Sequence, residues 1–217
     1  MFAGHIGAAL AIGRAEREVN VGVYIAAALL LDILLWLLVL LGWESVAIPA
    51  DFAGTHQAEF VFPYSHGLLA SVGWSVLAGL VGLAGYSRLR TRWRAAALIA
   101  AAVFSHWLLD ALVHRPELPL AGAASRAVGL GLWNHMSAAL TLEAAIVAIG
   151  LYLFVSGTQI ARARSIALAV LSVVVMAFTA VGMTLAPAPP SAAAMAGSSL
   201  ATLAVVCGLA CWLGRLP

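Results

Sequence analysis

Ionisable side chains are spaced four residues apart in an otherwise apolar stretch of this sequence. The segment 104–114 reads FSHWLLDALVH and carries His106, Asp110 and His114. Residues i, i+4 and i+8 lie on one face of an α-helix, so these side chains share a stripe. Imidazole and carboxylate groups are ligands of borderline and hard divalent cations such as zinc, manganese and iron. The spacing therefore predicts a metal-binding face.

Other apolar stretches also carry histidine and acidic side chains. A charged carboxylate inside the hydrocarbon layer costs roughly 2.5 kcal/mol or more, so such residues usually face a protein interior and are candidates for function. A divalent ion would compensate carboxylates that are otherwise buried without a partner. The predicted metal ligands are His5, Asp32, His66, His106 and Asp110. The alternative is a set of separate polar contacts, each between a side chain and its own neighbouring helix.

Several further residues are candidates for roles beside the metal. Glu143 is the candidate general base, or an outer ligand. His114 and Arg115 could receive a phosphate group, although His114 is also placed to cap the end of its helix. Asn134 could orient a substrate. His135 is assigned to substrate binding as well, with a hydrogen bond to a neighbouring helix as the alternative.

The elements that must position these side chains are membrane-spanning helices. Of the 217 residues, 64% are apolar and 9% are charged, whereas a soluble domain has roughly 25% charged residues. A span needs about 20 predominantly apolar residues. We therefore predict an all-α polytopic membrane protein with a short N-terminal partial-span helix over residues 1–13. Six transmembrane helices are expected over residues 21–41, 66–86, 95–113, 133–155, 165–186 and 193–213.

The candidate ligands are expected at similar depths in the membrane. With a rise of 1.5 Å per residue, His5, Asp32, His106 and Glu143 lie about 14 to 18 Å from the inner surface, and Asp110 lies at about 23 Å. Such a common level is what a single site requires.

The arginines predict the orientation, because short cytoplasmic loops are enriched in basic residues. Only Arg115 and Arg126 fall in one of the two alternating sets of loops. The other set contains Arg14, Arg17, Arg88, Arg90, Arg92, Arg94, Arg162, Arg164 and Arg215. We expect a bacterial inner membrane protein with both termini in the cytoplasm and its site in the periplasmic half. The net charge of +2 reports this topology, and no nucleic-acid partner is expected.

The two ends of the chain differ in chemistry. Residues 1–156 contain the candidate site, while residues 157–217 form an apolar pair of spans that we expect to act as a scaffold within one integrated domain. Cys207 and Cys211 are interpreted as small packing residues. The long loop 42–65 is expected to cover one end of the bundle, with His56 on its surface. Trp43, Trp107 and Trp133 fit an interfacial aromatic belt.

A family resemblance rests on an ordered set of motifs. They are MFAGHIG, LLLDILLW, PYSHGLL, FSHWLLDALVHRPELPL, and GLGLWN followed by Glu143. In this order they resemble small bacterial inner-membrane proteins of the LexA-regulated YdjM-like group, which are described as metal-dependent hydrolases and sometimes labelled permeases. The resemblance runs from Met1 to about Glu143.

That group is similar to zinc-dependent phospholipase C and S1/P1 nuclease, all-helical enzymes whose metals are held by His, Asp and Glu. The resemblance implies that His106 and Asp110 act as a His-x-x-x-Asp ligand pair. It also implies that Asp32 and His66 complete one metal site, and that His5 approaches a second site sharing Asp110.

The expected function is a membrane-embedded, metal-dependent phosphoesterase acting on lipid or lipid-linked phosphate at the outer leaflet. It would use one or two divalent ions, zinc first and manganese or iron as alternatives. Membrane lipids are the expected partners, and an oligomer or larger membrane complex is compatible with the sequence. A transporter or permease is the main alternative, since carriers also place polar groups near mid-membrane. A non-catalytic assembly subunit with a structural metal is another.

Overall fold

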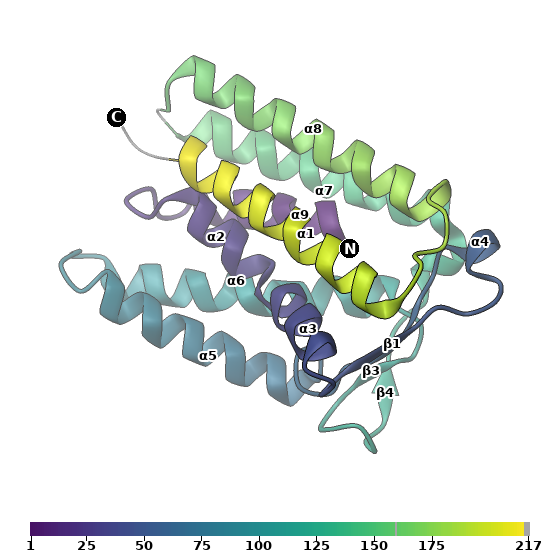
Figure 1. Ribbon diagram of the computed structural model, residues 1–217. Helices are drawn as coiled ribbons and strands as arrows, with labels where there is room; N and C mark the ends of the chain where they lie inside the picture. Colours follow the sequence, from purple (N-terminus) through teal and green to yellow (C-terminus); the bar gives the residue numbers. More distant parts are fainter. Residues whose placement is uncertain (159, 215–217) are drawn as a thin grey trace.

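A computed structural model, which describes residues 1–158 and 160–214, confirms the all-α polytopic fold (Figure 1). Arg215, which entered the orientation argument, lies outside the described residues. Five helices are long and apolar enough to cross a membrane, and a bent pair raises the number to six. The five are α5 (Leu68–Gly85), α6 (Arg92–Val113), α7 (Met136–Gly157), α8 (Arg162–Thr184) and α9 (Ala192–Leu213).

The first predicted span is broken. It consists of α2 (Val21–Ala28) and α3 (Leu30–Leu40), which meet at Leu29 with a bend of 48°. The bend leaves the last carbonyls of α2 outside a continuous helical ladder and places Asp32 in the first turn of α3. A carboxylate is favoured at this position, because the amino-terminal end of a helix carries partial positive charge.

The short apolar run at the start of the chain forms α1 (Phe2–Gly13), as predicted. It lies inside the bundle and packs closely along α7. Gly7 makes this approach possible, because a Cβ at that position would stand only 2.6 Å from the carbonyl oxygen of Ile146. Small residues have this role at contacts between membrane helices. The contact fixes the depth and rotation of α1, and with them the position of His5.

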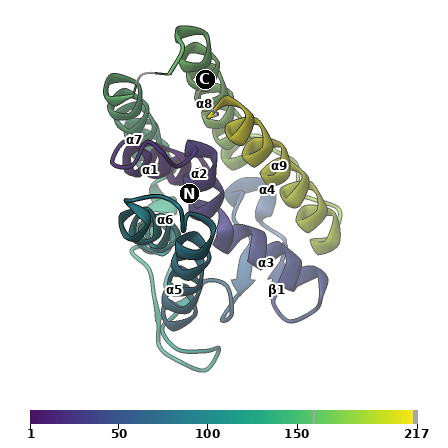
Figure 2. The same cartoon turned by 90° about the vertical axis from the view of Figure 1, so that its left-hand side faces the viewer.

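The helices form two outer pairs with a central layer between them. The antiparallel pair α5–α6 lies on one side and the pair α7–α8 on the other, with α1 and α2 between them (Figure 1). Helix α9, coloured yellow, packs against α2 and α3. Figure 2 shows α9 and α3 on the side of the bundle away from α7.

The short strands gather at one end of the helices. β1 (Ser45–Ala47) pairs antiparallel with β2 (Glu59–Val61), and the short helix α4 (Phe52–Thr55) connects them. β3 (Leu118–Pro119) pairs with β4 (Ala127–Val128), and the 3-10 turn η1 (Leu132–His135) leads into α7. The expected cover over one end of the bundle is therefore ordered. The connection between α5 and α6, which contains Arg88 and Arg90, and the start of α8, which contains Arg162 and Arg164, lie at the opposite end (Figure 1).

Candidate metal centre

Four of the predicted ligands converge in the interior of the bundle. His66 Nε2 and His106 Nε2 lie 3.1 Å apart. Asp110 Oδ2 lies 3.1 Å from His106 Nε2 and 3.5 Å from His66 Nε2. Asp32 Oδ1 approaches the same two nitrogens at 3.7 and 3.8 Å. Two aromatic nitrogens and two carboxylates from three parts of the chain thus face one point.

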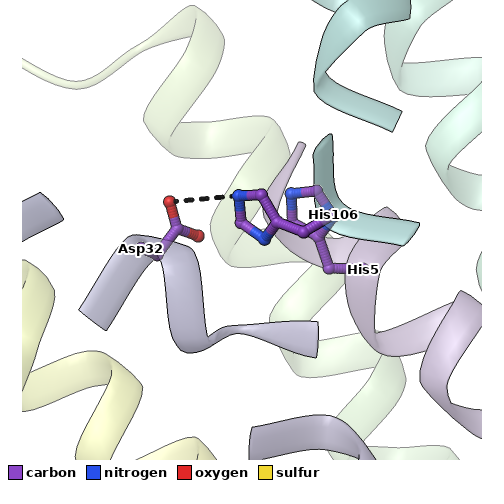
Figure 3. A group of neighbouring side chains, drawn as sticks. All are labelled: His5, Asp32 and His106. Carbon is purple, nitrogen blue, oxygen red and sulfur yellow. Dashed lines mark ion pairs between the residues drawn. The ribbon is translucent and has the colours of Figure 1, made fainter. Parts of the chain in front are cut away.

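The fifth predicted ligand lies next to this group. The His5 ring stacks on that of His106, with centroids 3.7 Å apart and planes at 11° (Figure 3). His5 Nε2 lies 3.2 Å from Asp110 Oδ1. Among the described residues, neither ring nitrogen of His5 has a hydrogen-bond partner. A buried imidazole is costly in that condition, and a bound ion would satisfy it.

The five ligands are positioned by four segments of the chain. Helix α6 presents His106 and Asp110 one turn apart, and the break after α2 turns Asp32 toward them. His66 lies in the tight connection just before α5, where its backbone N–H donates to the Phe62 carbonyl at 3.0 Å. His5 reaches the centre because α1 is only a partial span.

The outer ring nitrogens are held by hydrogen bonds. His106 Nδ1 lies 2.7 Å from the carbonyl oxygen of Ala28, the last residue of α2. His66 Nδ1 lies 2.8 Å from Ser65 Oγ, and Ser65 Oγ donates to Glu44 Oε2 at 2.7 Å. Metal-binding histidines typically have such a partner on the nitrogen that faces away from the ion.

These partners determine the tautomers of both histidines. A carbonyl oxygen only accepts, so His106 must donate from Nδ1. The Ser65 hydroxyl gives its proton to Glu44, so Ser65 Oγ accepts from His66 Nδ1. In their neutral forms both rings therefore direct an unprotonated Nε2 at each other and at two carboxylates. A cation between them would remove this repulsion, and the donor set fits a divalent ion.

Two overlapping groups of ligand atoms are present. His5, Asp32 and His106 form one group, and His66, His106 and Asp110 form the other, with the atoms of each group within 4.8 Å of one another. The two oxygens of Asp110 face different partners: Oδ1 faces His5, while Oδ2 faces His66 and His106. The cluster could therefore hold one ion, or two ions bridged by Asp110.

The centre is closed to solvent except on one side. His5 and His106 are fully buried and Asp110 is 2% exposed, whereas Asp32 is 22% exposed. The backbone nitrogen of Met1 lies 3.1 Å from Asp110 Oδ1. Glu143 of α7 is buried and accepts a hydrogen bond from the Gly4 N–H at 3.1 Å.

His114 belongs to the cluster, whereas three other predicted substrate-binding residues do not reach it. His114 Nε2 lies 3.6 Å from Asp110 Oδ2, and its Nδ1 lies 2.6 Å from Glu117 Oε1. Arg115 is half-buried, Asn134 and His135 are exposed, and none of these three lines the cavity described below. The turn η1 explains this for the last two, because it directs Trp133 inward.

Several residues of the site were not assigned to it by sequence. Glu44 and Ser65 support His66, and Glu117 supports His114. Trp133, interpreted as part of an interfacial belt, packs on His114 with ring centroids 4.2 Å apart. His56, expected at the surface, is half-buried and lines the cavity. The adjacency of Ser65 to His66 was the one local signal available.

Glu44 lies outside the spans, and its environment changes its acidity. Burial raises the pKa of the Glu44 carboxyl, while hydrogen bonds from Ser65 and from the Tyr64 N–H act in the opposite direction. Its oxygen Oε1 accepts from the backbone N–H groups of Tyr64 and Ser65, both at 2.8 Å. Glu44 therefore organises the connection that carries His66.

A cavity of about 380 Å³ begins at this centre. Asp32, His66, Asp110, His114 and Glu143 line one end of it. Its roof is aromatic and is formed by Trp36, Phe52, Phe60, Phe62 and Trp133. Much of the remaining wall comes from α8, α9 and the connection between them. The volume lies within the range of about 300–1,000 Å³ that is usual for sites binding small ligands.

The comparisons with known proteins yield no relative: no family model, curated protein or solved structure matches this chain.

Proposed function

We propose that this protein is a membrane-embedded, metal-dependent hydrolase that cleaves phosphoesters of lipids or lipid-linked phosphates. The observation that carries the proposal is the convergence of the Nε2 atoms of His66 and His106, 3.1 Å apart, with the carboxylates of Asp32 and Asp110. The resemblance to the YdjM-like group points in the same direction.

The donor set favours zinc, with manganese and iron as alternatives, because it combines imidazole with carboxylate and contains no thiolate. His66, His106, Asp110 and Asp32 would hold the first ion, and His5 with Asp110 would contribute to a second. A bound divalent ion would supply Lewis acidity, which activates water and neutralises phosphoryl oxygens.

The chain's own residues provide the proton chemistry. In hydrolysis the oxygen of water bonds to phosphorus, the phosphorus–oxygen ester bond breaks, and the leaving alcohol takes up a proton. Glu143, whose carboxylate lines the cavity, is the candidate to accept the proton from water. His114, held at Nδ1 by Glu117, is placed at the rim to donate to the leaving oxygen or to a phosphoryl oxygen.

The location of the centre supports a lipid substrate. It lies among membrane-spanning helices, toward the end that carries the short strands and away from the end that carries most of the arginines. The enrichment of arginine in cytoplasmic loops supports the periplasmic side for that end, next to the outer leaflet. A phosphate group at that depth is reached most directly by a lipid.

One observation favours a second candidate function, a transporter. The break between α2 and α3 places a carboxylate at a helix terminus inside the membrane, a feature of many carriers. The experiment below separates the two functions.

The test is elemental analysis of the purified protein beside the double variant His106→Ala/Asp110→Ala. The matched control is Asp51→Ala/Glu59→Ala, which removes two exposed acids of the β1–β2 region. We expect bound zinc, manganese or iron in the wild type and the control, and a loss of about tenfold or more in the double variant. Equal metal content in all three proteins would refute the ligand assignment.

The same preparations are then assayed for phosphate release from a lipid phosphate monoester. Metal together with turnover supports the hydrolase. Metal without turnover of any phosphoester supports a structural centre. Substrate flux across liposomes without hydrolysis supports the transporter.

A further inference from the structure

The cavity that begins at the candidate metal centre continues between the last two helices. On the α8 side it is lined by Phe178, Thr179, Gly182 and Met183, and on the α9 side by Met195 and Leu203 among others. All three carboxylates among the described lining residues, those of Asp32, Asp110 and Glu143, lie at the metal end. The cavity is therefore amphipathic along its length.

Three of the four hydroxyl groups on this wall add little polarity, and Ser199 carries the fourth. Thr179 Oγ1 donates to the Val175 carbonyl at 2.9 Å, and Thr202 Oγ1 donates to the Ser198 carbonyl at 2.9 Å. Ser198 Oγ donates to the Met195 carbonyl at 3.0 Å. Because each of these hydroxyl protons is used within its own helix, the wall presents mainly methyl, methylene and aromatic surface to the cavity.

The cavity also reaches the outer surface of these helices. Phe178, on its wall, is 56% exposed, and Ser198 on α9 is exposed as well. Both residues belong to helices that are long and apolar enough to span a membrane. An opening between them faces hydrocarbon, where an apolar chain can pass without entering water.

We propose that the space between α3, α8 and α9 binds the hydrocarbon chain of a single-chain, phosphate-bearing lipid, which enters sideways from the bilayer with its phosphate at the metal centre. The position of the phosphate rests on the proposed hydrolase function, whereas the position of the chain rests on the cavity alone. The pair α8–α9, expected to be a scaffold, then determines which substrates bind.

A single chain matches the available space. The cavity volume of about 380 Å³ is near the lower end of the usual range for small-ligand sites. Part of it is taken up at the metal end by a headgroup, which leaves room for one chain.

Gly182 offers a way to fill this space without disturbing the fold. A Cβ at Gly182 would meet no atom within 4 Å, although the residue lines the cavity. Gly197 on α9 is equally unobstructed, but it is exposed and is not a lining residue. Gly182→Leu is therefore the test variant, and Gly197→Leu is its matched control.

The first readout is photo-crosslinking and does not depend on activity. The probe is hexadecyl phosphate carrying a diazirine near the chain end, added to the purified full-length protein. Specific labelling is the part removed by excess unlabelled hexadecyl phosphate. We expect it on the cavity side of α8 and α9, unchanged in Gly197→Leu and reduced about tenfold in Gly182→Leu. Dihexadecyl phosphate, with two chains, should compete poorly.

Equal specific labelling in the two variants, or specific labelling away from α8 and α9, would overturn the chain-binding site. Full competition by dihexadecyl phosphate would overturn its restriction to a single chain.

The second readout separates this inference from the proposed function. Hydrolysis of hexadecyl phosphate is compared with that of phenyl phosphate, which lacks the chain. Gly182→Leu should lower the rate of hexadecyl phosphate hydrolysis about tenfold relative to that of phenyl phosphate. Gly197→Leu should leave the ratio of these two rates unchanged. An unchanged ratio in Gly182→Leu contradicts the chain site while the hydrolase remains. If neither ester is cleaved by the wild type, the hydrolase fails, and the crosslinking result still decides the chain site.

Discussion

His66 and His106 are oriented by partners of different kinds. His106 Nδ1 uses a main-chain carbonyl, that of Ala28, whereas His66 Nδ1 uses the hydroxyl of Ser65. A carbonyl at a helix end is fixed by the fold. A hydroxyl can rotate, and its direction is set here by Glu44. The orientation of His66 therefore depends on two side chains that can be replaced without touching the ligands.

Replacing Ser65 by alanine should weaken metal binding while leaving the ligands in place. The variant removes the acceptor of the His66 Nδ1 proton, and loss of such a partner typically lowers metal affinity by about 10- to 100-fold. Competition with a fluorescent zinc chelator measures the change. Ser75→Ala is the control, since the Ser75 hydroxyl bonds only to the Ser71 carbonyl of its own helix at 2.6 Å. Equal affinities for both variants would contradict the role of Ser65.

Glu44 makes stability depend on pH. Its folded-state pKa is raised above the usual value of 4.5 by burial, so the folded protein binds this proton more tightly than the unfolded chain does. The protonated Glu44 carboxyl therefore adds to the free energy of unfolding at low pH, and this stabilisation is lost as pH rises through the folded-state pKa. In Glu44→Gln this contribution should be absent. The melting temperature of the wild type should thus fall relative to the variant as pH is raised from about 4 upward. A constant difference across pH would contradict the assignment.

At the level of residues, the ligands themselves were predictable, including His66 in the connection before α5, whereas the side chains that support them from loops were not. The i, i+4 spacing predicts that His106 and Asp110 share a face, and depth within the spans brings Asp32 and His5 to the same level. Glu44 lies in a connection with no periodicity, so nothing in the sequence pairs it with Ser65.

At the level of elements, the length of α1 and its packing against α7 determine where His5 lies. The helix is too short to span the membrane, and its position comes from close contact with α7. That contact leaves no room for a side chain at Gly7.

Gly7→Ala should therefore displace α1. The added methyl group would meet the backbone of α7, and overpacking of this kind costs about 1–3 kcal/mol. For a chain of this size we expect a melting temperature lower by roughly 2–12 °C, measured in detergent, together with weaker metal binding. Gly73→Ala on α5, where a Cβ would meet nothing within 4 Å, is the control: it should leave metal binding unchanged and should not lower the melting temperature. Unchanged metal affinity in Gly7→Ala would contradict the claim that packing of α1 against α7 positions His5.

Hydropathy predicted the spans to within a few residues but could not show the break at Leu29. Apart from Asp32, the segment 21–41 is almost entirely apolar, and a continuous helix would satisfy its composition equally well. Tertiary contacts favour the bent form. The Ala28 carbonyl lies within hydrogen-bonding distance of His106 Nδ1, and the Asp32 carboxylate lies near His106 Nε2.

Considered as a whole, the molecule has a basic end and an end that carries the short strands. The connection between α5 and α6 bears arginines, and the region from β1 to β2 covers the opposite end beside the centre (Figure 1). Orientation in the membrane therefore decides which compartment has access to the centre.

Cysteine labelling in intact cells should report this orientation. In a background with Cys207→Ala and Cys211→Ala, we expect Gly54→Cys to react with a membrane-impermeant maleimide. Arg90→Cys should react only after the membrane is permeabilised. Both positions are exposed, so their reagent access differs only by compartment. The reverse pattern would place the centre on the cytoplasmic side and contradict an outer-leaflet substrate.

The bend between α2 and α3 has a thermodynamic consequence. A straight helix through Leu29 would draw the Ala28 carbonyl back into its own ladder and leave the His106 Nδ1 proton without an acceptor. The affinity for an ion held by His106 would therefore be linked to the curvature of this segment: a force that straightens the segment would weaken ion binding, and ion binding would favour the bent form. A bilayer thick enough to stretch α2–α3 would thus oppose loading, so membrane thickness itself would act as an effector of this centre.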